Sequence, residues 1–454
     1  MKHCRIPLLP CLARSVLPNR EQAEACSRYR PVAVLRFALA LCLALGPAVS
    51  PAAGADPMSD AEALLALDPA ALEAEVGNME ADPWSGFVAG GLRRIDIDQA
   101  GTGVVSRDAF MLLQPEYYRT LGDRQSVQAV AYLRSAGGDA RYTIADLREA
   151  WWEGSPGRVT LRVGVDRVFW GVTESQNLVD IINQRDLAAD IDGDEKLGQP
   201  MVKLSFDLAG GSLSAYWLPL FRERRFPARG DSLSTFPAIA ESQAEYESGR
   251  GRHHQDFALR WSSTRGQWDI GLSLFRGTDR QPQLLLNPAD GGQTLIPRYL
   301  LLDQAGLDLQ WTHGSWLLKL EAVRRWQSSG DYWATVGGFE YLWPSVFGSN
   351  IDAHLIGEHL YDSRKERAVT PFQHDVMIGA RLEFNDVQGT QLTAGLIEDQ
   401  HQPARSWRLD LSRRLLQDWR IQLKWRRYER IPPQEQLFGV RGVNYLEASL
   451  RYYF

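Results

Sequence analysis

The chain ends on the stretch 445–454, YLEASLRYYF, in which apolar and polar side chains alternate. One face would carry Leu446, Ala448, Leu450, Tyr452 and Phe454. The other would carry Tyr445, Glu447, Ser449, Arg451 and Tyr453. Successive residues of a strand point to opposite faces. A strand of about ten residues with one apolar and one polar face suits a membrane-spanning barrel, because lipid touches one face and a wet lumen the other.

The same alternation recurs along the chain, most clearly in 158–166, 202–208, 375–384 and 420–426. A water-soluble sandwich of two sheets also alternates, since its apolar faces meet each other. The alternation therefore predicts an all-β protein, and other signals must decide between lipid and a second sheet.

The connections between predicted strands supply one such signal. We count about 18 strands, with 16 as the alternative. The three longest connections, 169–199, 220–255 and 277–300, all fall on one side, and tight turns fall on the other. Outer-membrane barrels have short periplasmic turns and longer outside loops. The pattern predicts a transmembrane antiparallel up-and-down β-barrel over 86–454.

The N-terminus predicts export. A basic segment with Arg28, Arg30 and Arg36 precedes the apolar run 37–45, and small residues follow at 53–55. This order is typical of a signal peptide. We expect cleavage before Asp56, so that 1–55 is removed and 56–85 forms a short periplasmic segment. The alternative, a retained anchor helix, is disfavoured because about 20 apolar residues are needed to span a bilayer.

Composition excludes several classes of protein. The 454 residues are 44% hydrophobic and 23% charged, which excludes an acidic disordered chain. All four cysteines lie within 1–55, so the mature chain holds neither a disulfide nor a Cys-ligated metal or haem. Residues 56–454 keep 43 basic and 54 acidic residues, a net charge of −11. We expect no cofactor and no nucleic-acid partner.

Two segments resemble a known family. The stretch 168–171, VFWG, is followed by 177–184, NLVDIINQ, and by Asp186. Together they look like a signature of porin-like outer-membrane proteins of uncharacterised role in Gram-negative bacteria. The stretch 219–222, PLFR, with Phe226-Pro227, is similar to a second segment of that family, and the terminal Phe454 resembles the signal that barrel assembly machinery reads. The resemblance implies an outer-membrane location and names no solute.

About eighteen strands would enclose an aqueous channel. The connection 169–199 has an apolar stripe that needs something to pack against. We expect it to fold inward as a constriction loop or, as the alternative, to cap the outer surface. Its candidate residues are Phe169, Trp170, Asp180, Asn183 and Asp186. Candidate pore-lining residues are the basic ones on the predicted inner face: Arg158, Arg162, Arg408, Arg414, Arg420, Lys424 and Arg426.

Two further groups of residues could carry chemistry. Asp190, Asp192 and Asp194 flank Gly193 and resemble part of a calcium loop, without its regular spacing or distal Glu. Barrel hydrolases need an acid–base constellation, for which His354, Glu358, His359, Asp362 and His374 offer material. However, His354 and His359 differ in parity and should face opposite ways. We therefore expect a protein that is not an enzyme.

The sequence thus predicts a passive outer-membrane channel for small hydrophilic solutes, with a mild anion preference because rings of basic side chains steer anions. The alternatives are a closed barrel that exports a polymer or lipid or serves as a surface receptor, and, behind it, an outer-membrane hydrolase. Expected partners are outer-membrane lipids and lipopolysaccharide, the barrel assembly machinery and small-molecule solutes. The oligomeric state is left open, with a homo-oligomer among the options.

Overall fold

The computed structural model describes residues 82–99, 102–137, 143–190, 192–228, 237–368, 372–432 and 440–454. The signal peptide expected over 1–55 lies outside these residues, as does most of the segment 56–85. Both assignments therefore stay predictions.

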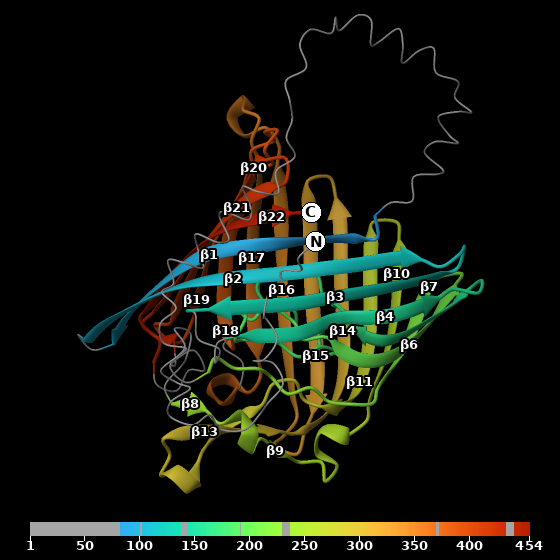
Figure 1. Ribbon diagram of the computed structural model, residues 1–454, viewed down its shortest axis with the longest axis horizontal. Coiled ribbons are helices and arrows are strands. Elements are labelled where there is room, and N and C mark those ends of the chain that lie inside the picture. The colour runs from blue at the N-terminus through green and yellow to red at the C-terminus, as the bar shows by residue number, and fades with distance from the viewer. Residues whose placement is uncertain are drawn as a thin grey trace, which may run out of the picture. The chain divides into compact units, whose positions relative to one another are not determined.

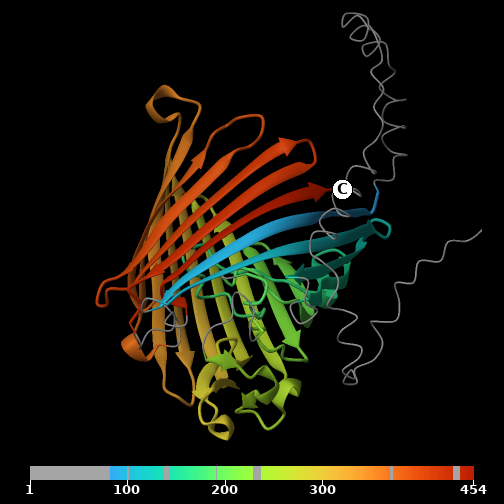
Figure 2. The same cartoon turned by 60° about the vertical axis from the view of Figure 1, so that its left-hand side comes forward.

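Eighteen antiparallel strands form one closed barrel, which confirms the predicted fold and the count of 18. Each strand pairs with the next along the wall, and β1 pairs with β22 to complete the ring (Figures 1 and 2). The barrel strands are β1 (Trp84–Gln99), β2 (Thr102–Thr120), β3 (Gln125–Ala136), β4 (Ile144–Gly154), β5 (Val159–Asp166), β6 (Gln199–Leu208), β7 (Gly211–Leu218), β10 (Asp256–Arg265), β11 (Trp268–Thr278), β14 (Leu301–His313), β15 (Trp316–Trp326), β16 (Tyr332–Trp343), β17 (Asp352–Asp362), β18 (His374–Glu383), β19 (Gln391–Asp399), β20 (Arg405–Leu416), β21 (Trp419–Glu429) and β22 (Val443–Tyr453).

The two ends of the barrel differ as predicted. Turns such as 209–210, 266–267 and 314–315 are tight and gather at one end, which we call the short-turn end. The connections 167–198, 219–255 and 279–300 leave the other end, the long-loop end. By the usual arrangement of outer-membrane barrels, the short-turn end faces the periplasm.

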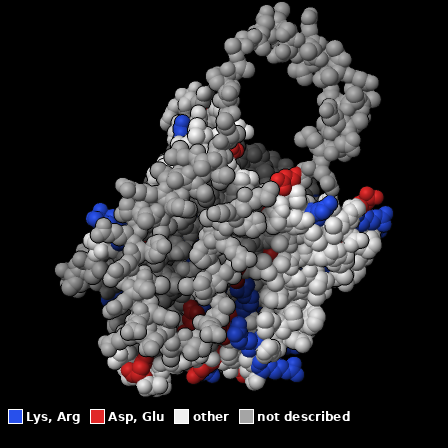
Figure 3. Space-filling view, in the orientation of Figure 1, with Lys and Arg blue, Asp and Glu red and all other residues white. Residues whose placement is uncertain are grey.

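The outer face of the wall is apolar. Large hydrophobic side chains point outward and stay exposed, among them Leu92, Val163, Leu259, Leu272, Leu274, Leu318, Leu355 and Ile378. In Figure 3 the stretch of wall left in view on the right is mostly uncharged, and charged side chains gather at its edges. A contiguous apolar surface of this kind needs a non-aqueous partner. Lipid supplies it in a membrane barrel.

This polarity gives a test. Leu272→Arg puts a charge on the outward face of β11, and we expect a loss of about 2–4 kcal/mol in the free energy of unfolding. Ser262→Arg on the adjacent strand β10 faces the lumen and should cost much less. Denaturant unfolding in lipid vesicles measures both, and equal losses would contradict the outward placement of Leu272.

Aromatic rings form pairs at the short-turn end of the barrel. Trp316 packs on Tyr341 with ring centroids 4.7 Å apart, and Trp419 packs on Tyr452 at 5.0 Å. Amphipathic rings suit the headgroup level of a membrane. Trp151 and Trp170 depart from this pattern, because both are buried inside the barrel.

The long connections carry a second sheet that the sequence pattern did not predict. It contains β8 (Ala238–Ile239), β9 (Glu245–Tyr246), β12 (Gln283–Leu286) and β13 (Thr294–Tyr299), near the bottom of Figure 1. Short 3-10 helices are η2 (Glu241–Gln243), η3 (Gly251–His253), η4 (Pro288–Asp290), η5 (Val346–Gly348) and η6 (Lys365–Arg367). Within the described ranges, helices long and apolar enough to cross a membrane are absent.

Candidate functional site in the barrel lumen

The connection between β5 and β6, residues 167–198, lies inside the barrel, and we call it the constriction loop. Its residues Leu178, Val179, Ile181 and Ile182 are buried in one apolar cluster with inward-facing side chains of the wall. The wall side chains of this cluster are Met201, Tyr216, Leu218, Ala258, Phe275, Leu302, Val323, Ala334, Val336, Ile356, Leu360 and Met377. The apolar stripe noted in the sequence therefore packs against the inner wall.

A buried carboxylate on β15 holds the first part of the loop. Glu321 accepts hydrogen bonds from the backbone N–H of Val172 (2.8 Å), Thr173 (3.1 Å) and Val179 (3.2 Å). It also accepts one from the hydroxyl of Thr173 at 2.8 Å. Because Glu321 is fully buried, these donors replace its water shell. The bonds fix the loop backbone against the wall.

A second carboxylate, Glu358 on β17, repeats this arrangement. It accepts the backbone N–H of Glu174 at 2.8 Å and of Ser175 at 2.9 Å, and the hydroxyl of Ser175. The side chain of Glu174 then reaches two wall cations, Lys319 at 2.9 Å and Arg381 at 3.2 Å. This part of the loop is therefore bound to β15, β17 and β18 of the wall.

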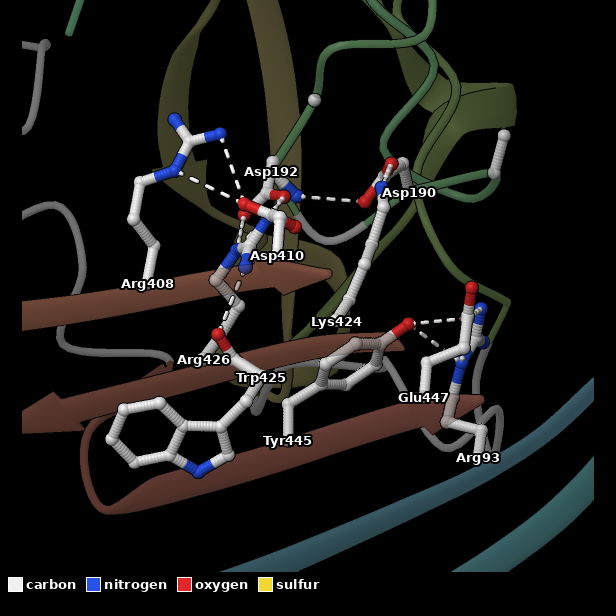
Figure 4. Close-up of polar contacts among 12 residues, drawn as sticks. Arg93, Asp190, Asp192, Arg408, Asp410, Lys424, Trp425, Arg426, Tyr445 and Glu447 are labelled. Atoms are coloured by element: carbon white, nitrogen blue, oxygen red, sulfur yellow. Dashed lines mark hydrogen bonds and ion pairs between the residues drawn. The ribbon is translucent and has the colours of Figure 1, made fainter. Parts of the chain in front are cut away.

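Farther along, the loop binds other strands through carboxylates (Figure 4). Asp190 forms an ion pair with Lys424 of β21, and Asp192 binds Arg426 of the same strand at 2.7 Å. Arg426 also pairs with Asp410 of β20 at 2.8 Å. The loop thus contacts β15 and β17 with one segment and β21 with another, so it extends across the lumen.

Two arginines of β3 and β4 hold the stretch between these segments. Arg134 donates to the carbonyl oxygens of Ala188 and Ala189, both at 3.0 Å. Arg148 is fully buried and binds Asp186 at 2.7 Å. The sequence alternation did not single out either arginine, since a basic residue on an inner face reads equally well as a solvated wall.

The predicted loop residues have distinct places. Trp170 is buried against Tyr216, whereas Phe169 is 63% exposed, with the Lys196 ammonium 4.7 Å from its ring centroid. Asp180 pairs with Lys196 at 2.5 Å.

Asn183 closes the base of the loop. Its amide donates to the carbonyls of Asp166 (2.8 Å) and Leu197 (2.9 Å), and its Oδ1 accepts the backbone N–H of Val168. These bonds join the two ends of the loop. Asn183 therefore sets where the chain enters and leaves the lumen.

The predicted basic pore residues fall into two groups. Arg162, Arg408, Lys424 and Arg426 each have a carboxylate partner, Arg162 with Glu153 and Asp166 at 2.8 Å and Arg408 with Asp410 at 3.3 Å. Arg158, Arg414 and Arg420 have no ion pair with any residue that the structure describes, and Arg158 lies in the exposed turn before β5.

The predicted calcium residues do not gather around a common point. Asp190 and Asp192 point to Lys424 and Arg426, and Asp194 is exposed. In the described part of the chain, three or more metal-binding side chains do not come together. Cations of the protein itself thus occupy Asp190 and Asp192, two of the three carboxylates.

Acidification tests the Asp190 anchor. Burial works to raise the pKa of Asp190, but the charge and hydrogen bond of Lys424 outweigh it and lower the pKa. A carboxylate with a lowered pKa contributes stability that is lost only as pH falls through that value. We expect the Asp190–Lys424 contact to persist from neutral pH to about 4, the ordinary Asp pKa, and to be lost below it, with a change in single-channel conductance.

In a Lys424→Met variant the Asp190 pKa is no longer lowered, so the conductance change should move to higher pH. A transition at the same pH in the wild type and in Lys424→Met, measured with the same bilayer recordings, would contradict the anchor.

A closed barrel of 18 antiparallel strands, apolar outside, with charged side chains and one apolar cluster inside and a loop held in its lumen, has the fold of a porin-like barrel of the outer membrane. No protein-family model and no curated protein matches the sequence. Similar solved structures include OccAB2 of Acinetobacter baumannii, with 11% identity and a TM-score of 0.48 over 83% of this chain and 99% of that one.

Two further similar structures are OmpT, an outer membrane protein of Vibrio cholerae, and a mutant porin of Rh. blastica. OmpT has 11% identity and a TM-score of 0.42, over 82% of this chain and 98% of that chain. The Rh. blastica porin has 11% identity and a TM-score of 0.39, over 82% and 99%. The barrel assignment rests on this chain's own strand pairing.

Proposed function

We propose that the protein is an outer-membrane channel for passive diffusion of small hydrophilic solutes, narrowed by the constriction loop and mildly selective for anions. The observation that carries the proposal is the attachment of this loop to the inner wall by buried carboxylates and cations. A loop fixed across the lumen limits the size of the solutes that can pass, and no separate plug is needed for this. The apolar outer wall supports contact with lipid and lipopolysaccharide.

The proposed anion preference has a local basis. Most lumen cations near the constriction loop are balanced by carboxylates, so they add little net field. Arg414 and Arg420, in contrast, lack an ion pair among the described residues. Uncompensated guanidinium groups in a pore attract anions.

A non-catalytic role is part of the proposal. His354 faces inward and binds Glu340 at 2.7 Å, while His359 is exposed on the outward face. Glu358 is occupied by the backbone of the constriction loop. The acid–base residues of β17 thus stand apart from one another, which supports transport over hydrolysis.

Planar bilayer recording in a salt gradient tests the proposal. We expect discrete conductance steps with a reversal potential that indicates a modest preference for chloride over potassium. Purified protein that inserts but shows no steps would defeat the channel and favour the closed exporter or receptor. Clear cation selectivity would defeat the anion preference alone.

A further inference from the structure

Three arginines lie side by side on the inner wall near the short-turn end. Arg420 of β21 pairs directly with Arg414 of β20 and with Arg451 of β22. Directly paired residues of antiparallel strands share a face of the sheet. Lys424 and Arg426 stand at even positions of β21, as Arg420 does, and both bind the constriction loop. The three arginines, which we call the arginine row, therefore face the lumen.

Carboxylates that the structure describes do not balance the charge of the arginine row. None of its members forms an ion pair with a described residue. Arg414 donates to the carbonyl of Val387 at 3.0 Å, and the guanidinium of Arg451 lies 4.8 Å from the centroid of the Phe87 ring. The buried Nε of Arg451 has no hydrogen-bond partner in the described ranges. Like charges directly opposite each other on a sheet are destabilising, so an anion held between them would relieve a standing cost.

An uncharged polar row follows the arginine row toward the long-loop end. Gln422 of β21 pairs with Ser412 of β20 and with Ser449 of β22. Two residues along a strand correspond to about 7 Å. Hydroxyl and amide groups, which can both donate and accept hydrogen bonds, thus lie about 7 Å along the strands from the arginine row. A small molecule can span this distance.

The next row along the wall has balanced charge. It contains Lys424, flanked by Asp410 and Glu447, and the constriction loop contributes Asp190. The arginine row and the polar row together therefore form a patch with excess positive charge at one edge and neutral hydrogen-bonding groups beside it. We call these six residues the wall patch.

We propose that the wall patch binds small hydroxylated carboxylates, with the carboxylate on the arginine row and the hydroxyl groups on the polar row. Guanidinium groups bind carboxylates in a two-pronged geometry that is stronger than a single neutral hydrogen bond. The hydroxyl groups of the ligand then meet Ser412, Gln422 and Ser449. This assignment names a solute class for the channel and rests on the proposed function.

Glucuronate is the probe, with glucose and acetate as the comparisons. Glucose has the ring hydroxyl groups without the carboxylate, and acetate has the carboxylate without the hydroxyl groups. We expect glucuronate, added on the short-turn side of single wild-type channels, to interrupt the current at lower concentration than acetate, and glucose to leave the current unchanged. Calorimetric titration of the detergent-solubilised protein measures the same binding without needing conduction.

Variants locate the site. Arg420→Gln with Arg451→Gln should weaken glucuronate binding by about tenfold or more, equivalent to at least about 1.4 kcal/mol. Arg420→Lys keeps the charge but loses the two-pronged guanidinium geometry, and it should weaken glucuronate binding by an intermediate amount. Ser412→Ala with Ser449→Ala should weaken glucuronate and leave acetate unchanged. Arg276→Gln is the control, because this arginine is exposed on β11 and pairs with Asp303 outside the lumen.

Two results would overturn the site: glucuronate binding no tighter than glucose in the wild type, or undiminished binding in the double arginine variant. Either can occur in a channel that conducts normally, so the channel proposal would survive. A wild-type protein that binds glucuronate at the wall patch but never conducts would defeat the channel and leave the site in place.

Discussion

Glu321→Ala combined with Glu358→Ala is expected to raise single-channel conductance several-fold, because the two carboxylates hold five backbone N–H groups of the constriction loop. A buried donor left without an acceptor costs about 1–3 kcal/mol. Four of the five donors belong to residues 172–175, so the penalty in this segment is about 4–12 kcal/mol, and the ion pairs of Glu174 with Lys319 and Arg381 offset only part of it. This segment should leave the wall and let water and ions pass.

Recordings of conductance and of exclusion by neutral polymers of graded size measure the widening. Glu321→Gln with Glu358→Gln should give a smaller increase, since each amide oxygen still accepts. Glu398→Ala is the control, as Glu398 pairs with Arg405 and has no contact with the loop among the described residues. Unchanged conductance in the double alanine variant would show that the loop does not limit flow.

The second large effect concerns stability. Arg148→Met should lower the free energy of unfolding by about 3–5 kcal/mol, because breaking a buried ion pair strands its partner. Arg148 is fully buried and binds Asp186 at 2.7 Å and Asp146 at 2.9 Å, with its guanidinium 4.3 Å from the centroid of the Tyr132 ring. Arg225 also pairs with Asp186, at 3.1 Å, and would still neutralise it in the variant. The expected loss therefore lies toward the lower end of this range.

Denaturant unfolding in lipid vesicles gives the measurement. Arg148→Met with Asp186→Leu should recover part of the loss, since the buried Asp186 charge is removed together with its main partner. Arg276→Met provides the matched control: its side chain is 78% exposed, and exposed pairs contribute roughly 0–1 kcal/mol. A loss for Arg148→Met no larger than that of the control would contradict the buried anchor.

Alternation of side chains predicted most of the barrel because lipid and lumen impose a period of two on every crossing. Most of the eighteen strands follow from it, and the lengths of the connections add the division into tight turns and long loops. The small sheet of β8, β9, β12 and β13 was missed, since strands of two to six residues carry too little pattern.

The candidate site was predicted only in part. The apolar stripe at 178–182 showed that this connection packs against something, and it does. The anchors were missed because they join distant parts of the chain: Glu321 meets Val172 across 149 positions, and Lys424 meets Asp190 across 234. One sequence has no local signal for such partners. Asp190 and Asp192 illustrate this, because their partners Lys424 and Arg426 lie on β21, far away in the sequence.

The seam between β1 and β22 has a consequence for biogenesis. Arg93 on the first strand binds Glu447 on the last, 354 positions away, and Phe454 exchanges backbone hydrogen bonds with Gly86. Until β22 has been delivered, the chain has two unpaired strand edges and cannot close into a barrel. Unpaired edges promote aggregation. A chain truncated before β22 should therefore be degraded by periplasmic proteases. Pairing of β1 with β22 is the late step that separates a closed barrel from an incomplete one.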